Sequence, residues 1–127
     1  QYRVPLGRPC IELPAGLIGD DEGCEGESAL AAAGRELEEE TGYRAGRLED
    51  CGEFYSSPGL VSESFLLVRA TELEKVAIGG GTADENITVH RVAISGLADF
   101  IDRQRERGAA LDVKLLTLLG PDLLRGA

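Results

Sequence analysis

The apolar positions of this chain alternate with polar ones in some segments and recur at helical spacing in others. Alternation, or a short apolar run between turn residues, is typical of a β-strand. By this criterion five segments are predicted to be strands: residues 1–5, 8–13, 46–55, 64–70 and 87–94. In the second of these we expect Ile11 and Leu13 to face the core.

Helical spacing appears first in the segment that follows Ser28. Ser28 is a good N-cap, and strong helix formers come directly after it. Thr41-Gly42 is a typical helix stop, because glycine adopts the left-handed conformation readily. The apolar stripe of this predicted helix consists of Ala29, Leu30, Ala33 and Leu37.

Two further helices are predicted near the end of the chain. Ser95 is positioned to cap a helix that carries Leu97, Phe100 and Ile101 at i, i+3 and i+4 spacing. Asp112 starts a final helix rich in leucine. Residues 79–86 are polar and rich in glycine, so we expect a mobile loop; they lack the Gly-Lys-Ser/Thr ending of a phosphate-binding P-loop.

Composition narrows the class of protein. The 127 residues carry 13 basic and 23 acidic side chains, a net charge of −10, which argues against a general nucleic-acid binder. No apolar run approaches the roughly 18 residues that a membrane span needs, and we find no signal peptide. The chain begins with Gln1 and contains no methionine, so we expect a trimmed version of a longer protein. Its three cysteines, at no metal-ligand spacing, are interpreted as reduced thiols in a cytoplasmic protein.

The candidate chemistry lies in a cluster of carboxylates. On a helix, Glu36, Glu39 and Glu40 fall within about a third of the circumference, whereas Glu38 points the opposite way. Like charges at i,i+4 cost stability, so a fold that keeps them together usually neutralises them with a hard divalent cation. The alternative interpretation is a solvated acidic face.

The residues around the cluster follow a longer pattern, Glu27-x7-Arg35-Glu36-Leu37-x-Glu39-Glu40-x-Gly42-Tyr43. This pattern resembles the Nudix box, the signature of a family that hydrolyses nucleoside diphosphates linked to another moiety. The family has a glycine six residues before the first glutamate, where this chain has Asp21. Gly16 looks equivalent, so we interpret residues 19–26 as an enlarged loop.

The resemblance implies a single Nudix domain over residues 1–127 that lacks part of an N-terminal extension. The implied fold class is α/β (α+β): an α/β/α sandwich with a mixed sheet, the acidic helix on one side and the C-terminal helices on the other. Within the motif, we expect structural roles for Gly16, Glu27, Arg35 and Gly42. Arg35 is placed to pair with Glu39 at i,i+4 or with Glu27.

Magnesium is the expected cofactor, with Mn²⁺ as the alternative, because hard cations prefer oxygen ligands. The expected ligands are Glu36, Glu39, Glu40 and, by family resemblance, the backbone carbonyl of Ala15. Glu39 and Glu40 are also expected to take part in catalysis. The family places an acidic base just before the strand at residues 87–94; Glu85 matches it, and Asp84 is the rival.

Substrate-binding residues are expected in two other places. Pro58 lies fifteen residues beyond Tyr43, and the Pro58-Gly59 turn followed by Glu63 is similar to the ADP-ribose pyrophosphatase subfamily. A turn proline that happens to fall there is the alternative. Arg3 is a candidate ligand contact, since arginine suits phosphate recognition, although a surface arginine is the commoner outcome.

Metal-dependent pyrophosphate chemistry follows from these residues, and the resemblance supplies the substrate. It implies hydrolysis of ADP-ribose, or a related nucleoside diphosphate sugar, to AMP and ribose 5-phosphate. The alternatives are GDP-mannose or a dinucleoside polyphosphate as substrate, and a non-catalytic ADP-ribose sensor or an acidic partner-binding domain. The expected partner is a small-molecule nucleotide sugar, with no nucleic acid and no membrane, and the resemblance implies a homodimer.

Overall fold

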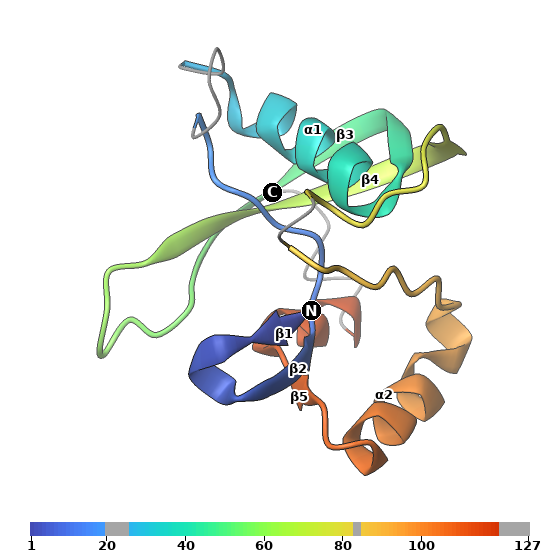
Figure 1. Cartoon of the computed structure of the whole chain (residues 1–127). Helices are drawn as coiled ribbons and strands as arrows, with labels where there is room; N and C mark the ends of the chain where they lie inside the picture. Colours follow the sequence, from blue (N-terminus) through green and yellow to red (C-terminus); the bar gives the residue numbers. More distant parts are fainter. Residues whose placement is uncertain (20–25, 83–84, 120–127) are drawn as a thin grey trace.

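The computed structural model describes residues 1–19, 26–82 and 85–119. A small mixed sheet has the strand order β1-β2-β5 (Figure 1). Strand β2 (Arg8–Ile11) pairs antiparallel with β1 (Tyr2–Arg3) and parallel with β5 (Ala110–Leu111). The predicted strands at residues 1–5 and 8–13 are therefore confirmed, though both are shorter than expected. A 3-10 turn over Val4–Leu6 ends the first, and the second ends at Ile11.

A long antiparallel hairpin forms a second sheet from β3 (Tyr43–Tyr55) and β4 (Ser64–Lys75). Both strands extend beyond the predicted segments. The register shifts between Asp50 and Glu53, where a bulge interrupts the pairing. Near the turn that joins the strands, the rings of Phe54 and Phe65 stack with their centroids 5.9 Å apart, which holds the two strands in register there.

Helix α1 (Ala29–Thr41) packs against this hairpin (Figure 1). The Ser28 hydroxyl accepts a hydrogen bond from the Ala31 N–H at 3.2 Å, so the predicted N-cap is confirmed. The predicted stop is confirmed as well. Gly42 has φ of 73°, and its N–H donates to the Glu38 carbonyl at 2.8 Å.

Helix α2 (Leu97–Glu106) lies beside β5 and turns its buried Leu97 inward. The prediction that Ser95 caps this helix is wrong. Ser95 lies inside a 3-10 turn over Ile94–Gly96, and no side chain bonds the first turn of α2 at its cap, Gly96. The final helix does follow Asp112, but Val113–Leu119 is a 3-10 helix.

The strand predicted for residues 87–94 is not formed. Among the described residues, no strand pairs with this segment. Its alternating apolar side chains, among them Ile87, Val89 and Val92, instead line a cavity. Thr88 and His90 of the same segment also line this cavity, so the segment contributes polar as well as apolar side chains to the wall.

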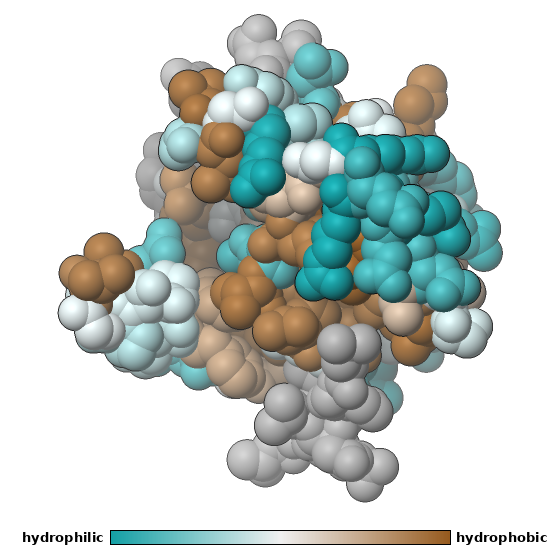
Figure 2. Space-filling view, turned by 90° about the horizontal axis from the view of Figure 1, so that it is seen from below, coloured by the Kyte–Doolittle hydropathy of each residue, from teal (hydrophilic) through white to brown (hydrophobic). Residues whose placement is uncertain are grey.

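Among the described residues, few apolar side chains are buried. They are those of Cys10, Ala32, Leu97 and Leu115. Ile11 and Leu13 are half-buried, so they face the interior only in part. Apolar side chains also gather near the middle of the face shown in Figure 2, beside a band of polar ones. The mixed α+β class is confirmed, with the mixed pairing located in the β1-β2-β5 sheet. Within the described ranges, every helix is too short or too polar to cross a membrane.

Candidate active site

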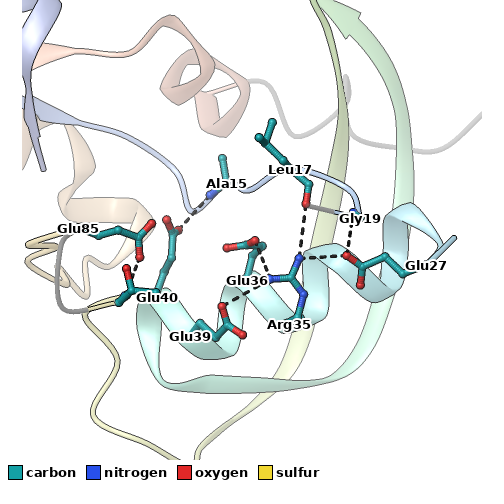
Figure 3. A network of polar contacts seen from close by, with 10 residues as sticks. Ala15, Leu17, Gly19, Glu27, Arg35, Glu36, Glu39, Glu40 and Glu85 are labelled. Carbon is teal, nitrogen blue, oxygen red and sulfur yellow. Dashed lines mark hydrogen bonds and ion pairs between the residues drawn. The ribbon is translucent and has the colours of Figure 1, made fainter. Parts of the chain in front are cut away.

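A row of carboxylates runs along one side of α1 (Figure 3). We use the name carboxylate row for Glu27, Glu36, Glu39 and Glu40. Glu38 is not part of it, because both of its carboxylate oxygens accept hydrogen bonds at 2.9 Å from Arg44 of β3. The predicted division of the helix into two acidic faces is therefore observed.

Arg35 lies at the N-terminal end of the row and contacts three of its carboxylates. Its guanidinium donates to Glu27 at 3.0 Å and to Glu36 at 2.9 Å, and lies 3.5 Å from Glu39. It also donates to the Leu17 carbonyl at 3.4 Å. Both predicted pairings of Arg35 thus occur together, and the contact with Glu36 was missed.

Glu27 fixes the chain that precedes the helix. Besides its pairing with Arg35, its carboxylate accepts a hydrogen bond from the Gly19 N–H at 3.1 Å. Hydrogen bonding to Arg35 is the main reason that the pKa of Glu27 is held below its usual value. This end of the row therefore joins loop and helix. Residues 20–25, the middle of the predicted enlarged loop, lie outside the described residues.

Glu40 lies at the opposite end of the row in a different environment. Its carboxylate accepts a hydrogen bond from the Ala15 N–H at 3.0 Å. Burial raises the pKa of Glu40 to about 7, and the negative charges of Glu36 and Glu85 contribute to the rise. A carboxylate in such surroundings favours a proton or a cation.

The turn at residues 14–16 forms one wall of this site. Gly16 lies so close to Glu36 that a Cβ on it would overlap the Glu36 carboxylate. Together with the bond from Ala15 to Glu40, this places the backbone of the turn against two carboxylates of α1. A Cβ at position 16 would therefore displace the flexible end of the Glu36 side chain.

Glu85 approaches Glu40 from the loop after β4 (Figure 3). Its carboxylate accepts a hydrogen bond from the Thr82 N–H at 2.6 Å, and its carbonyl accepts one from the Gln1 side chain at 2.8 Å. The structure therefore brings the predicted base to the C-terminal end of the carboxylate row. Its rival, Asp84, lies outside the described residues.

A cavity of about 230 Å³ opens beside Ala15 and Glu40. Its other walls come mainly from apolar side chains of the 87–94 segment, α2 and the final 3-10 helix. Arg3 also lines the cavity and forms two hydrogen bonds, of 2.7 and 2.8 Å, with the Glu12 carboxylate. Arg3 was predicted to contact a ligand, and its place at the cavity is compatible with that role, which stays a prediction; Glu12 was not foreseen as its partner.

The remaining predicted substrate residues lie elsewhere. Pro58, Gly59 and Glu63 belong to the turn that joins β3 to β4, and none of them lines the cavity. Glu63 accepts a hydrogen bond from the Ser56 hydroxyl at 2.6 Å, which closes the turn. Within the described part of one chain, these residues are not brought to the carboxylate row.

The C-terminal part of the carboxylate row, which contains Glu36 and Glu40, suits a hard divalent cation. In the described ranges, no three acidic, histidine or cysteine side chains are already gathered as a complete metal cage. Glu36 and Glu40 nevertheless lie against one turn, and their mutual repulsion contributes to the raised pKa of Glu40. A cation bound between carboxylates removes that repulsion, so the donor set fits such an ion.

Comparison with known proteins agrees with this geometry. Residues 3–110 match the model of the NUDIX domain family. The chain is 43% identical over 83 residues to an ADP-sugar pyrophosphatase of Mus musculus, covering 65% of this chain and 33% of that protein. It is 44% identical over 73 residues to an ADP-ribose pyrophosphatase of Bacillus subtilis, covering 58% and 37%.

A GDP-mannose pyrophosphatase of Cronobacter sakazakii is 36% identical over an alignment 134 residues long, which covers 99% of this chain and 65% of that protein. In these three matches the chain spans less than two thirds of the relative's length. The family model, in contrast, matches most of the chain and includes the whole carboxylate row. The chain therefore belongs to the Nudix family.

Proposed function

We propose that this protein hydrolyses the pyrophosphate bond of ADP-ribose, or of a related nucleoside diphosphate sugar, with the help of a divalent metal ion. The products are AMP and ribose 5-phosphate. The observation that carries the proposal is geometric: Glu36 and Glu40 both lie against the backbone of residues 15–16, and Glu85 approaches Glu40 from the other side (Figure 3). Relatives named ADP-sugar and ADP-ribose pyrophosphatases support the substrate class.

Nudix hydrolases generally use divalent metals, and the donors of this site favour Mg²⁺, with Mn²⁺ as the alternative. Glu36, Glu39, Glu40 and the Ala15 carbonyl would hold the ion. When bound, it stabilises the negative charge that builds up on the pyrophosphate oxygens and activates water. The Glu39 side chain is 46% exposed and that of Glu36 only 15%, so Glu39 is the more open to an ion that enters from solvent.

Glu85 is the proposed general base. Water attacks one phosphorus, the bridging P–O bond breaks, and the proton of the water passes to the Glu85 carboxylate. The Thr82 N–H bonds one carboxylate oxygen of Glu85 at 2.6 Å and so orients the other. Glu40, under this proposal, remains ionised beside the cation and contributes to the stabilisation of charge.

The cavity beside Glu40 is the proposed site for the uncharged part of the substrate. Its walls include Leu13, Val89 and Phe100, which suit a sugar or base face better than a phosphate. Arg3 stands at the same cavity and supplies positive charge for the phosphates. Pro58, Gly59 and Glu63 stay predicted substrate residues, and under this proposal they act on the site of a second copy.

A substrate panel tests this function. The protein is assayed with ADP-ribose, GDP-mannose and a dinucleoside polyphosphate, each with Mg²⁺ and with a chelator, and nucleoside monophosphate is measured. We expect release from ADP-ribose that the chelator abolishes. Faster release from GDP-mannose would reassign the substrate in line with the Cronobacter relative. Binding of ADP-ribose without any release of nucleoside monophosphate would favour the alternative of a non-catalytic ADP-ribose sensor.

We also propose a homodimer in the cytoplasm. Leu60 and Val61, in the turn between β3 and β4, are 88% and 50% exposed, and under this proposal they lie in the surface that the second copy covers. Sedimentation of the protein tests this. A Leu60→Ser variant should shift the equilibrium toward monomer, and a wild-type protein that is already monomeric would contradict the dimer.

A further inference from the structure

The C-terminal end of α1 is held by groups from a distant part of the chain. The last carbonyls of a helix have no partner within the helix and must find donors elsewhere. Here the Gly80 N–H donates to the Glu40 carbonyl at 2.7 Å, and the Gly81 N–H donates to the Glu39 carbonyl at 3.1 Å. The loop that leads to Glu85 is therefore bonded to the backbone of two residues of the carboxylate row.

Lys75 completes this arrangement from the end of β4. Its ammonium donates to the Thr41 carbonyl at 2.8 Å and to the Ile78 carbonyl at 3.0 Å. The same nitrogen lies 4.6 Å from the centre of the Tyr43 ring, a cation–π distance. One side chain thus joins the last residue of the helix to the start of the glycine-rich loop.

The glycines at this contact have no room for a side chain. A Cβ on Gly79 would overlap the backbone of Thr41 and Gly42, and one on Gly42 would overlap the backbone of Ala77. Gly79 also has φ of 76°, in the left-handed region. The two backbone segments therefore touch directly. We call Lys75 and Gly79–Gly81 the glycine clamp.

The clamp leads straight to the proposed base. A Cβ on Gly81, whose φ is 72°, would overlap the Glu85 carboxylate. The N–H of the next residue, Thr82, donates a hydrogen bond to that carboxylate at 2.6 Å. The Ile87 N–H donates one to the Gly80 carbonyl at 3.4 Å. The residues on both sides of Glu85 are thus hydrogen-bonded to the clamp or adjoin it, and the clamp is hydrogen-bonded to the end of α1, the helix that carries Glu40.

We propose that the glycine clamp positions Glu85 opposite Glu40, and that Lys75 is a positioning residue for the hydrolysis. This inference rests on the proposed function, because it assigns Lys75 a role through the proposed base. Lys75 touches backbone carbonyls and an aromatic ring, so its effect on turnover passes through the placement of the loop.

The central experiment replaces Lys75 in the full chain and measures kcat and KM for ADP-ribose with Mg²⁺. Lys75→Met should lower kcat about tenfold, because misplacing a catalytic group by a fraction of an ångström has effects of this size, with KM within about twofold. Lys75→Arg, which keeps a cationic donor, should recover most of kcat. Lys114→Met is the matched control, since Lys114 pairs with Asp112 away from the clamp.

A double variant shows whether Lys75 acts through Glu85. Once Glu85→Gln has removed the base, Lys75→Met should cause little further loss of kcat. An equal tenfold loss in that background would overturn the proposal, because Lys75 would then act independently of Glu85. Glu85→Gln with wild-type turnover would overturn it as well, since the clamp would have no base to position.

Amide hydrogen exchange supplies a readout that needs no activity. Lys75→Met and Gly79→Ala should both speed exchange at the Gly80 and Gly81 amides. Gly108→Ala is the control for Gly79→Ala, because Gly108 has a similar φ of 82° and a Cβ added there would meet no described atom within 4 Å. Unchanged exchange in both clamp variants would overturn the proposal. If the wild type hydrolyses none of the substrates, the proposed function fails, and exchange alone decides whether the clamp holds the loop.

Discussion

The two ends of the carboxylate row contain the same chemical group in opposite electrostatic states. At the N-terminal end, Glu27 pairs with Arg35, and its pKa is lowered. At the C-terminal end, Glu40 is bonded by the neutral N–H of Ala15, and its pKa is raised to about 7. The length of α1 therefore separates a carboxylate that is already neutralised from one that is not.

This difference separates structural from chemical roles within one motif. A guanidinium partner holds a carboxylate in its ionised form, as the lowered pKa of Glu27 beside Arg35 shows. A half-buried carboxylate among other carboxylates gains from a metal ion, because the ion offsets both burial and repulsion. The arginine of the row thus joins loop to helix, and the far end is left for a cation.

The largest expected effect comes from removing the charge at the open end. Glu40→Gln should lower turnover of ADP-ribose by about a hundredfold or more, since loss of supporting groups alone typically costs about ten- to a hundredfold at metal sites. Steady-state kinetics at saturating Mg²⁺ measures this. Wild-type turnover in Glu40→Gln would refute the metal-binding role of the C-terminal end of the carboxylate row.

A smaller loss of turnover is expected from a substitution at Gly16, in the backbone segment against which Glu36 and Glu40 lie. Gly16→Ala introduces a methyl group where the Glu36 carboxylate lies. The flexible end of Glu36 moves aside at little cost in folding, but it leaves the metal-binding position, so turnover should fall about tenfold. Kinetics and a thermal melt together test this. A large drop in melting temperature with full activity per folded molecule would contradict the explanation.

Removing Arg35, which pairs the carboxylates at the N-terminal end of the row, should lower the thermal stability of the protein. Arg35→Ala leaves the carboxylates of Glu27 and Glu36 without their shared guanidinium, and should lower the melting temperature by several degrees. Arg44→Ala is the control, because Arg44 pairs with Glu38 at an exposed position and should change the melt little. Equal effects of the two variants would show that the Arg35 network has no special role.

The smallest effect is on the pH dependence of stability in the absence of metal. The pKa of Glu40 rises from 4.5 to about 7 on folding, so the folded state binds more protons between these values. Stability from this group is present below pH 4.5 and is lost as the pH rises to about 7. Glu27, with its lowered pKa, contributes in the opposite sense, and its contribution is lost as the pH falls below 4.5.

Melts of the metal-free protein between about pH 4 and 8 measure this balance. Glu40→Gln should flatten the decline of stability between pH 4.5 and about 7, whereas Glu27→Gln should flatten the acid side. Added Mg²⁺ should reduce the decline in the wild type, because the ion replaces the proton at Glu40. A decline that persists unchanged in Glu40→Gln would assign it to another group.

The sequence by itself determined the features that depend on neighbours along the chain. The Ser28 cap, the Gly42 stop and the two acidic faces of α1 follow from the capping chemistry and the 3.6-residue period, and all are observed. The Arg35 pairings lie within about one helical turn or just before the helix, so spacing indicated them too. Family resemblance identified the motif, because its residues lie together in the sequence.

Only the tertiary structure decided what depends on segments far apart. Residues 87–94 alternate like a strand, but in the described part of the chain they pair with no strand and line the cavity beside Glu40. Residues 79–81 looked like a mobile loop, yet the N–H groups of Gly80 and Gly81 satisfy carbonyls in the last turn of α1. The raised pKa of Glu40 likewise depends on burial and on Glu85, 45 residues away, because desolvation and Coulomb interactions act through space and not along the chain.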